Sequence, residues 1–335
     1  MERRTVLSLG AGALAGIGLG SAHAAPPQAH LFGRSVTDFG VMPDTEQDQT
    51  RAIQKAIDEI AASSQPILIP PGTYTVAGVE LPTGKPIHIQ GAGQLSRLRH
   101  SSQKGFILTR GAAPGRALSL SQLALEANFK HGGSGPYGAL QLQDGAASVH
   151  HVEIILHGGT GIAAGGATLD LSDLSISGHS GEGTGIDAKS STVRLFRSRF
   201  AQCDIGVRIT ENSAAQIHDN VFVSCATHGA SIASGTIQGN KFSGAGREAK
   251  IALRAGGPDR LGSLLVTNNM IENAQIGIGV SNAPEGYALI SLNMITGARD
   301  GAIRALDGER PVGPDLARSS AESFRNLAIA GNVAL

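Results

Sequence analysis

One short pattern recurs along most of this chain and constrains the fold more than any other feature. In each copy, an aliphatic residue is followed three residues later by a middle position, and two residues after that by Phe, Ile, Leu or Ala. The middle positions lie about 20 to 40 residues apart, which is a repeat length typical of solenoids whose coils carry insertions. They are Leu123, Val152, Leu174, Ser198, Asn220, Asn240, Asn269, Asn293 and Asn332. We therefore predict an all-β chain folded as a parallel β-helix.

The asparagines at the middle position have a structural explanation. Parallel coils stack about 4.8 Å apart, so the same residue type at the same turn lets each side-chain amide bond the amide of the next coil. Such a ladder would satisfy buried backbone groups at the bend. We assign a structural role, and no ligand, to Asn220, Asn240, Asn269 and Asn293, with Asn332 as a weaker last member.

The first residues carry an export signal. Residues 1–24 contain Arg3-Arg4, a weakly apolar run rich in Gly and Ala, and the small-residue pattern Ala22-His23-Ala24. These features predict a twin-arginine signal peptide, and they argue against a membrane anchor. We expect cleavage after Ala24, export in the folded state by the twin-arginine machinery, no stable membrane span after cleavage, and a periplasmic or secreted protein.

The mature chain divides into a linker at 25–37 and a β-helix domain at 38–335. Within the domain, residues 38–76 form an N-terminal unit whose amphipathic helix covers the open end of the solenoid. Asp44 is the expected cap of that helix, with Gln47 at the reciprocal position. Residues 120–303 form the regular coils, 304–328 a charged loop excursion, and 329–335 a partial last coil.

The charge composition limits which classes of partner we expect the protein to bind. The chain has 27 basic and 27 acidic residues, and hence a formal net charge of zero. There is no basic excess to release counterions, so we expect no nucleic-acid partner. The 46 glycines and the absence of tryptophan fit a protein dense in turns.

The N-terminal unit also carries a resemblance. The segments "DFGV", "DQTRAIQKAID" and "ILIPPGTY" resemble the start of the pectate-lyase-like superfamily of right-handed parallel β-helices, which includes polygalacturonases, pectin lyases and phage tailspikes. Together with the twin-arginine signal and the repeated Asn, the chain is similar to a family of twin-arginine-translocated repeat proteins of uncharacterised function. For that family the resemblance implies a cofactor bound in the folded state. The Asn-Thr-Asp and Asp-Asp motifs of polygalacturonases are absent.

Outward strand positions supply candidate catalytic residues. Asp187 and Lys189 occupy one coil, and Arg208 occupies a matching position on the next. A lyase of the resembled superfamily uses a carboxylate-bound divalent cation and a base, and these three residues, with His179, are candidates for those roles. The alternative is a solvated pair of opposite charges that contributes little.

A column of potential metal ligands lies three residues after the aromatic position, at His157, His179, Cys203 and Cys225. Their coils span about 14 Å, which is too far for four ligands around one zinc ion. A pairwise site stays possible. The two cysteines are either within disulfide range or a pair of buried thiols.

A basic patch at Arg194, Arg197 and Arg199, with Arg208 nearby and Glu182 in a glycine-rich loop, completes the candidates. It could bind an acidic glycan or keep an exposed edge soluble. Three functions stay open: binding of an acidic polysaccharide or cell-envelope glycan, polysaccharide lysis or hydrolysis, and carriage of a cofactor or metal.

Overall fold

The computed structural model describes residues 33–102, 104–128, 136–179, 181–210, 212–244, 248–256, 262–281, 286–318 and 326–335. The predicted signal peptide lies outside these residues. Strand β1 begins at Arg34, before the domain boundary at residue 38 that the sequence predicts. Within the described ranges, no helix is long and apolar enough to cross a membrane.

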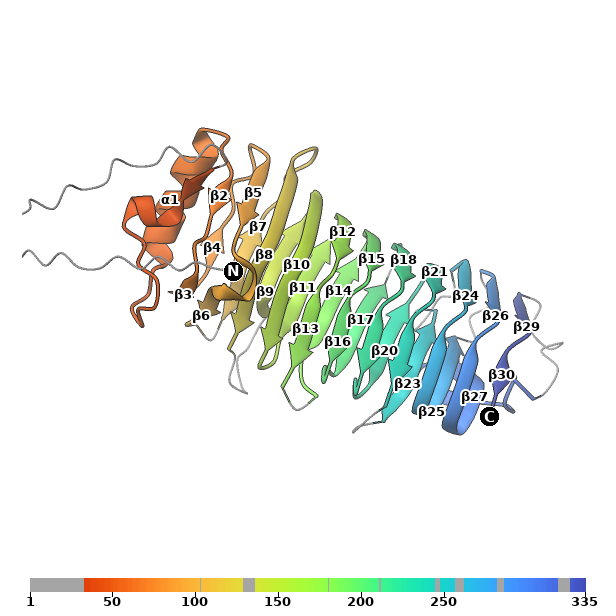
Figure 1. Ribbon diagram of the computed structural model, residues 1–335. Coiled ribbons are helices and arrows are strands. Elements are labelled where there is room, and N and C mark those ends of the chain that lie inside the picture. The colour runs from red at the N-terminus through yellow and green to blue at the C-terminus, as the bar shows by residue number, and fades with distance from the viewer. Residues whose placement is uncertain are drawn as a thin grey trace, which may run out of the picture. The chain divides into compact units, whose positions relative to one another are not determined.

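The described chain winds into successive coils, each built of short parallel strands (Figure 1). Strands at equivalent places in successive coils pair in register and form three parallel rows. The first row comprises β1 (Arg34–Ser35), β2 (Ile67–Leu68), β5 (Ile87–Gln90), the starts of β8 (Ala117–Ala127) and β10 (Ala146–Leu156), β12 (Thr168–Ser172), β15 (Thr192–Phe196), β18 (Ala214–His218), β21 (Gly235–Gln238), β24 (Leu264–Thr267), β26 (Ala288–Ser291) and β29 (Leu327–Ala330).

The second and third rows complete each circuit. The second row comprises β3 (Gly72–Val76), β6 (Ser96–His100), the ends of β8 and β10, β13 (Ser175–Gly178), β16 (Arg199–Ala201), β19 (Val221–Val223), β22 (Lys241–Ser243), the starts of β25 (Met270–Ser281) and β27 (Met294–Asp307), and β30 (Val333–Ala334). The third row comprises β4 (Val79–Glu80), β7 (Gly105–Arg110), β9 (Tyr137–Gln143), β11 (Thr160–Gly165), β14 (Thr184–Lys189), β17 (Ile205–Thr210), β20 (His228–Ile232), β23 (Ala249–Ala255), and the ends of β25 and β27. The chain is thus a parallel β-helix.

The core lies inside the coils, where the inward side chains of all three rows meet. Equivalent residues of successive coils stack on one another, because the strands pair in register. The rings of Phe200 and Phe222 stack with centroids 5.0 Å apart, and those of Phe222 and Phe242 with centroids 4.7 Å apart. All three side chains are buried. The aromatic position of the sequence repeat is therefore a core position.

The asparagines of the repeat form a buried ladder along one turn. The Nδ2 atom of each donates to Oδ1 of the next coil's asparagine, at 3.0 Å from Asn220 to Asn240, 3.0 Å to Asn269, 2.9 Å to Asn293 and 2.9 Å to Asn332. Each Oδ1 also accepts the backbone N–H of the preceding ladder residue at 3.0 Å. The ladder thus pairs backbone groups that the bend takes out of strand pairing.

The turn itself has one backbone feature that recurs from coil to coil. The residue directly before each ladder position has a left-handed backbone conformation, as at Asp219 (φ 58°) and Gly239 (φ 68°). Asp, Asn and Gly tolerate this conformation better than most residues. The left-handed residue reverses the chain sharply, and the following asparagine then points inward.

Helix α1 (Thr50–Ala62) packs at the N-terminal end of the described coils (Figure 1). Ile53, Ile57 and Ile60 are buried in the core, as the apolar stripe predicts. The predicted cap is wrong. Asp48 Oδ1 accepts the Thr50 N–H at 2.8 Å, whereas Asp44 Oδ1 accepts the N–H of Thr73 at 2.9 Å and so ties the loop before the helix to β3.

At the other end of the third row, β27 continues to Asp307, so strand pairing extends into the excursion predicted at 304–328. Strand β28 (Arg310–Val312) then pairs antiparallel with the end of β27. Two short 3-10 helices, η1 (Val36–Phe39) and η2 (Gly93–Leu95), lie in the first coils.

Candidate binding face

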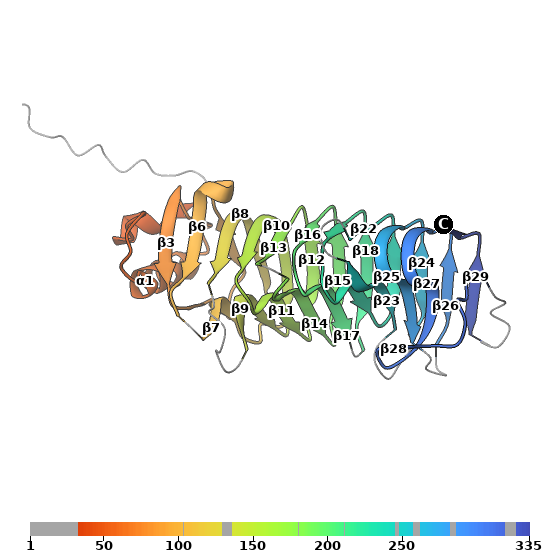
Figure 2. The same ribbon diagram turned by 90° about the horizontal axis from the view of Figure 1, so that it is seen from below.

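The outer side of the third row presents one strand position in register over many coils (Figure 2). The position is occupied in turn by Gln141, Ala163, Asp187, Arg208, Ser231, Arg254, Gly279 and Arg304. Arginine therefore recurs at every second coil from β17 to β27, at intervals of about 10 Å. We call Arg208, Arg254 and Arg304 the arginine row.

The first member of the arginine row holds a carboxylate. Arg208 Nε donates to Asp187 Oδ1 at 3.1 Å and Nη2 donates to Oδ2 at 2.6 Å, which is a bidentate pair. The hydrogen bonds to Asp187 raise the pKa of Arg208. The Arg208 side chain is 40% exposed, and Lys189 lies exposed two residues beyond Asp187 on the same strand. This part of the face is open to solvent and carries charges of both signs, because Asp204 as well as Asp187 acts on Arg208.

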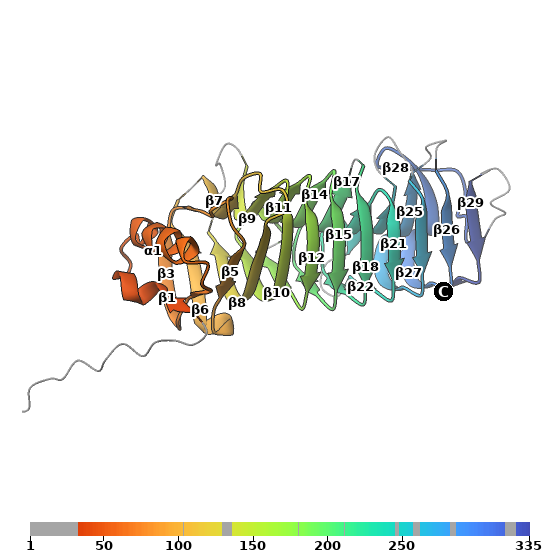
Figure 3. The same ribbon diagram turned by 90° about the horizontal axis from the view of Figure 1, so that it is seen from above.

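Arg254, the second member of the arginine row, also lies close to a carboxylate, which comes from the hairpin that joins β27 to β28. Glu309 lies in this hairpin, and Figure 3 shows β28 beside β25. Glu309 Oε1 is 3.6 Å from Arg254 Nη1, and Glu309 Oε2 is 3.1 Å from His228 Nε2. The hydrogen bond with His228 lowers the pKa of Glu309. Arg254 and His228 are only 4% exposed, so Glu309 closes over two buried basic groups.

Besides Arg304 Nε, two polar atoms in this covered part have no partner in the described chain. They are Arg254 Nε and His228 Nδ1, both shielded from solvent. Apolar side chains of Ile251, Ile276 and Leu306 form a small cluster separate from the main core. A hydrogen bond of 3.1 Å from Arg254 Nη2 to the Gly308 carbonyl further ties the hairpin to the face.

Arg304, the third member of the arginine row, lies on β27 and donates hydrogen bonds to backbone carbonyls near the hairpin. Arg304 donates to the carbonyls of Asp300 and Gly313. Asp315 accepts the N–H groups of Ala302 and Ile303 at 2.9 and 3.0 Å, which holds the segment after the hairpin against β27. The covered part of the face is thus a fixed assembly of hydrogen bonds.

Sequence reasoning singled out Arg208 and missed Arg254, Arg304, His228 and Glu309. A signal for the arginines was present. "GVRI" at 206–209 is followed by "ALRA" at 252–255 and "AIRA" at 302–305, which repeat the same inward, outward, inward alternation with Ala in place of Gly. Glu309 could not be found this way, because it comes from a hairpin outside the repeat.

The structure separates the predicted basic patch. Arg194 lies on the first row, Arg199 on the second and Arg208 on the third, so these side chains do not share one face. Arg197 lies in the turn between β15 and β16, where Nε and Nη2 bind the two carboxylate oxygens of Asp173 at 2.9 and 2.8 Å. That hydrogen bonding lowers the pKa of Asp173.

Glu182, the acidic member of the proposed glycan-binding residues, lies apart from the patch, in the loop between β13 and β14. Its backbone N–H donates to the His179 carbonyl at 3.2 Å.

The potential metal ligands form pairs. The rings of His157 and His179 approach with centroids 5.4 Å apart, and both lie at the ends of strands of the second row. Cys203 and Cys225 are free, buried thiols, and burial raises the pKa of Cys203 to about 12. Within the described ranges, no three His, Cys, Asp or Glu side chains gather as a metal site would need.

The pairing of Asp187 also bears on the lyase hypothesis. Both of its carboxylate oxygens accept hydrogen bonds from Arg208. In this arrangement Asp187 neutralises the adjacent arginine, which is the charged-pair alternative that the sequence left open.

The fold and this face define a class of protein. Residues 33–122 match the family described as rhamnogalacturonase A/epimerase, pectate lyase-like, and residues 127–259 match the family described as right-handed beta helix region. The chain is a right-handed parallel β-helix, and the two matches support its assignment to the pectate-lyase-like superfamily. No curated protein sequence matches the chain.

Solved structures show the same fold at low identity. A hyperthermoactive exopolygalacturonase from Thermotoga maritima is 12% identical, with a TM-score of 0.52 over 89% of this chain and 91% of that one. The tailspike of the E. coli bacteriophage HK620, solved as a double mutant with a pentasaccharide, is 12% identical, with a TM-score of 0.57 over 89% of this chain and 65% of that one. A bacteriophage phi29 gene product 12 is 16% identical, with a TM-score of 0.56 over 84% and 48%.

Proposed function

We propose that this protein binds an acidic polysaccharide along the outer face of the third row, with a carboxylate of the sugar held at Arg208, the accessible member of the arginine row. One observation carries the proposal: two arginines of the row already hold carboxylates, Asp187 at Arg208 and Glu309 at Arg254. Arginine is suited to this role because its planar fork matches a carboxylate.

The open part of the face is where a ligand would bind first. Lys189 and Arg208 are accessible, whereas Arg254 and His228 lie beneath Glu309. The strand positions toward the N-terminus carry neutral polar side chains at Gln141 and Thr160, which can hydrogen-bond sugar hydroxyls. A rigid parallel sheet keeps these groups at fixed intervals, which lowers the entropic cost of binding a repetitive polymer.

Two of the similar structures support the substrate class. One is by name a polygalacturonase, and the other is a tailspike in complex with a pentasaccharide. The N-terminal sequence supports a glycan as the ligand. A twin-arginine signal would deliver the folded protein to the periplasm or beyond, where envelope and extracellular glycans occur.

The first test compares a polyuronate with neutral dextran by titration calorimetry. Arg208→Gln should weaken polyuronate binding about tenfold, because it removes a charge-assisted bond of roughly 1.4 kcal/mol or more. Asp187→Asn should strengthen it, because it frees Arg208 from its internal partner. Arg51→Gln, on the exposed face of α1, makes the same change of charge away from the site and should have no effect.

Equal affinity of all three variants, or equal binding of dextran, would contradict the proposal. The same mixtures should be assayed for new reducing or unsaturated sugar ends. Their appearance would identify an enzyme rather than a binding protein.

A further inference from the structure

A charged side chain occupies an inward position in the N-terminal half of the solenoid. Arg110 ends β7, and the residues in register with it on the following coils are all apolar. They are Leu142, Ala164, Ala188, Ile209, Ile232, Ala255, Val280 and Ala305. Arg110 itself is only 3% exposed. The repeat calls for an apolar residue here, so the guanidinium needs a separate explanation.

The contacts of Arg110 leave its charge without a counterpart. Nη2 donates to the Lys85 carbonyl at 3.0 Å. Nε and Nη1 are shielded from solvent, and no atom of the described chain accepts a hydrogen bond from either. A guanidinium stays protonated in proteins, and an unpaired buried charge is strongly destabilising. Burial lowers the pKa of Arg110.

Arg110 lines a small cavity. It measures about 10 Å³, enough for a single water molecule or a single monatomic ion, and Arg110 contributes to its wall. The rest of the wall comes from Leu142, Gln143 and small residues at Ala113, Gly145, Ala147 and Ala167, among others. None of these side chains carries a charge. The only charge in the wall is therefore positive.

We propose that this cavity is a binding site for a small monovalent anion of halide size, with chloride as the physiological occupant. A water molecule could accept a hydrogen bond from Arg110, but it would leave the buried charge uncompensated. A carboxylate of a sugar or peptide is too large for the space. A halide supplies one negative charge and accepts N–H donors from several directions. The site is independent of the glycan-binding face, which lies on the outer side of the same row.

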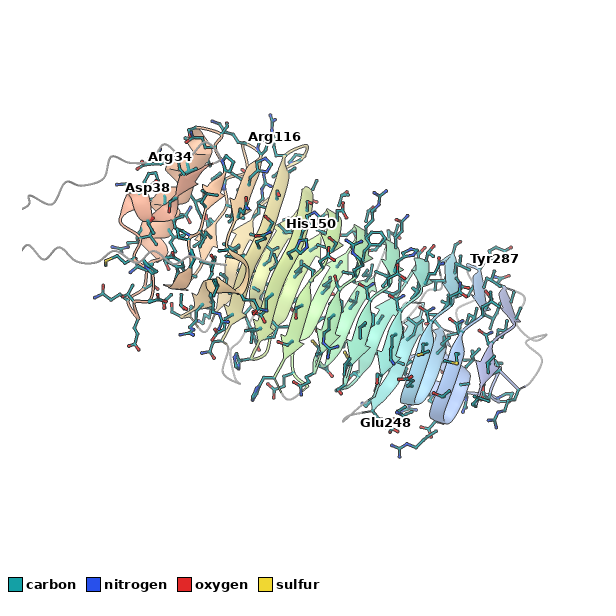
Figure 4. The ribbon with its side chains drawn as sticks, viewed as in Figure 1. Arg34, Asp38, Arg116, His150, Glu248 and Tyr287 are labelled. Atoms are coloured by element: carbon teal, nitrogen blue, oxygen red, sulfur yellow. The ribbon has the colours of Figure 1, made fainter. Side chains whose placement is uncertain are left out.

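Thermal unfolding in sodium chloride, sodium bromide and sodium gluconate at equal ionic strength tests the site. A bound ligand stabilises the folded state by mass action. The wild-type Tm should therefore rise saturably with chloride and bromide relative to gluconate, and the rise should disappear in Arg110→Met. Arg116→Met is the matched control, because Arg116 is exposed and points away from the coils (Figure 4), and it should keep the halide response.

Crystals of the wild-type protein grown in bromide give a second measurement that does not depend on whether Arg110→Met folds. Anomalous scattering should place bromide within hydrogen-bonding distance of Arg110. An equal halide response in wild type and Arg110→Met, or a cavity that holds water without bromide, would overturn the proposal.

Discussion

At the scale of single residues, the asparagine ladder gives the buried turn the hydrogen-bond partners that water gives an exposed turn. From Asn240 on, each Oδ1 takes two donors, the backbone N–H and the side-chain amide of the preceding asparagine. Asn220 Oδ1 accepts the Ser198 N–H at 2.9 Å. Ser198 continues the pattern with its hydroxyl, which accepts the Leu174 N–H at 3.0 Å. The earlier coils have aliphatic residues at this position, so the ladder belongs to the C-terminal half.

An internal ladder residue should contribute far more stability than a terminal one. Asn240→Ala leaves the buried Asn220 N–H without an acceptor, whereas the Asn220 amide keeps two backbone carbonyls. The substitution also removes the bonds that the Asn240 amide donates, so we expect the free energy of unfolding to fall by about 3 kcal/mol. Asn332→Ala should cost less than about 1 kcal/mol, because Asn332 is half-exposed and water can replace it. Urea denaturation of both variants measures the difference. Equal losses would mean that burial of the ladder is not what makes it stabilising.

At the scale of elements, the hairpin between β27 and β28 is held to the third row by a hydrogen bond from Arg254 to the Gly308 carbonyl and by the ionic contacts of Glu309. Its pairing with His228 lowers the pKa of Glu309 below the usual value of 4.5. A carboxyl with a lowered folded pKa stabilises the folded state above its unfolded pKa, and this contribution is lost as the pH falls through the folded value. The attachment of the hairpin should therefore weaken below about pH 4.5.

Hydrogen exchange of the β28 amides at pH 6 and at pH below 4 measures this attachment. Wild type should lose protection in acid, and Glu309→Gln should show the weaker protection already at pH 6. Asp307→Asn removes an exposed carboxyl of the same hairpin and should behave as wild type. Asp315, whose pKa is also lowered, is present in all three proteins and therefore adds the same loss of stability in acid to each of them. An acid-induced loss of the same size in Glu309→Gln as in wild type would exclude Glu309 as its source.

The coils were predictable because their signals are local and repeated. The ladder positions and the aromatic column follow from a single period, and the register then brings Asp187 beside Arg208. The basic patch was not predictable from residue spacing alone. Arg194 and Arg199 are five residues apart, but a turn lies between them and directs them to different rows. Arg110 could not be placed either, because its strand precedes the first clear copy of the repeat.

At the scale of the whole described β-helix, stability comes from contacts between neighbouring coils, and an open end exposes strand edges that can pair with another chain. Helix α1 covers the N-terminal end with Ile53, Ile57 and Ile60, each at most 1% exposed. This cover should matter more for preventing association through the N-terminal strand edges than for holding distant coils together, because those coils contact only their own neighbours.

In Ile57→Ser, the cover of the N-terminal end should be lost while the structure of the later coils is kept. In a single globular core, both would be lost together. We expect α1 to detach and the protein to associate, while the later coils keep their β-structure. Light scattering coupled to size exclusion measures association, and hydrogen exchange shows which coils stay protected. Arg51→Ser, a change on the exposed side of the same helix, should associate no more than the wild type. If Ile57→Ser instead loses protection evenly from α1 to β27, the coils fold as one cooperative unit, and the helix is part of that unit rather than a cover for its end.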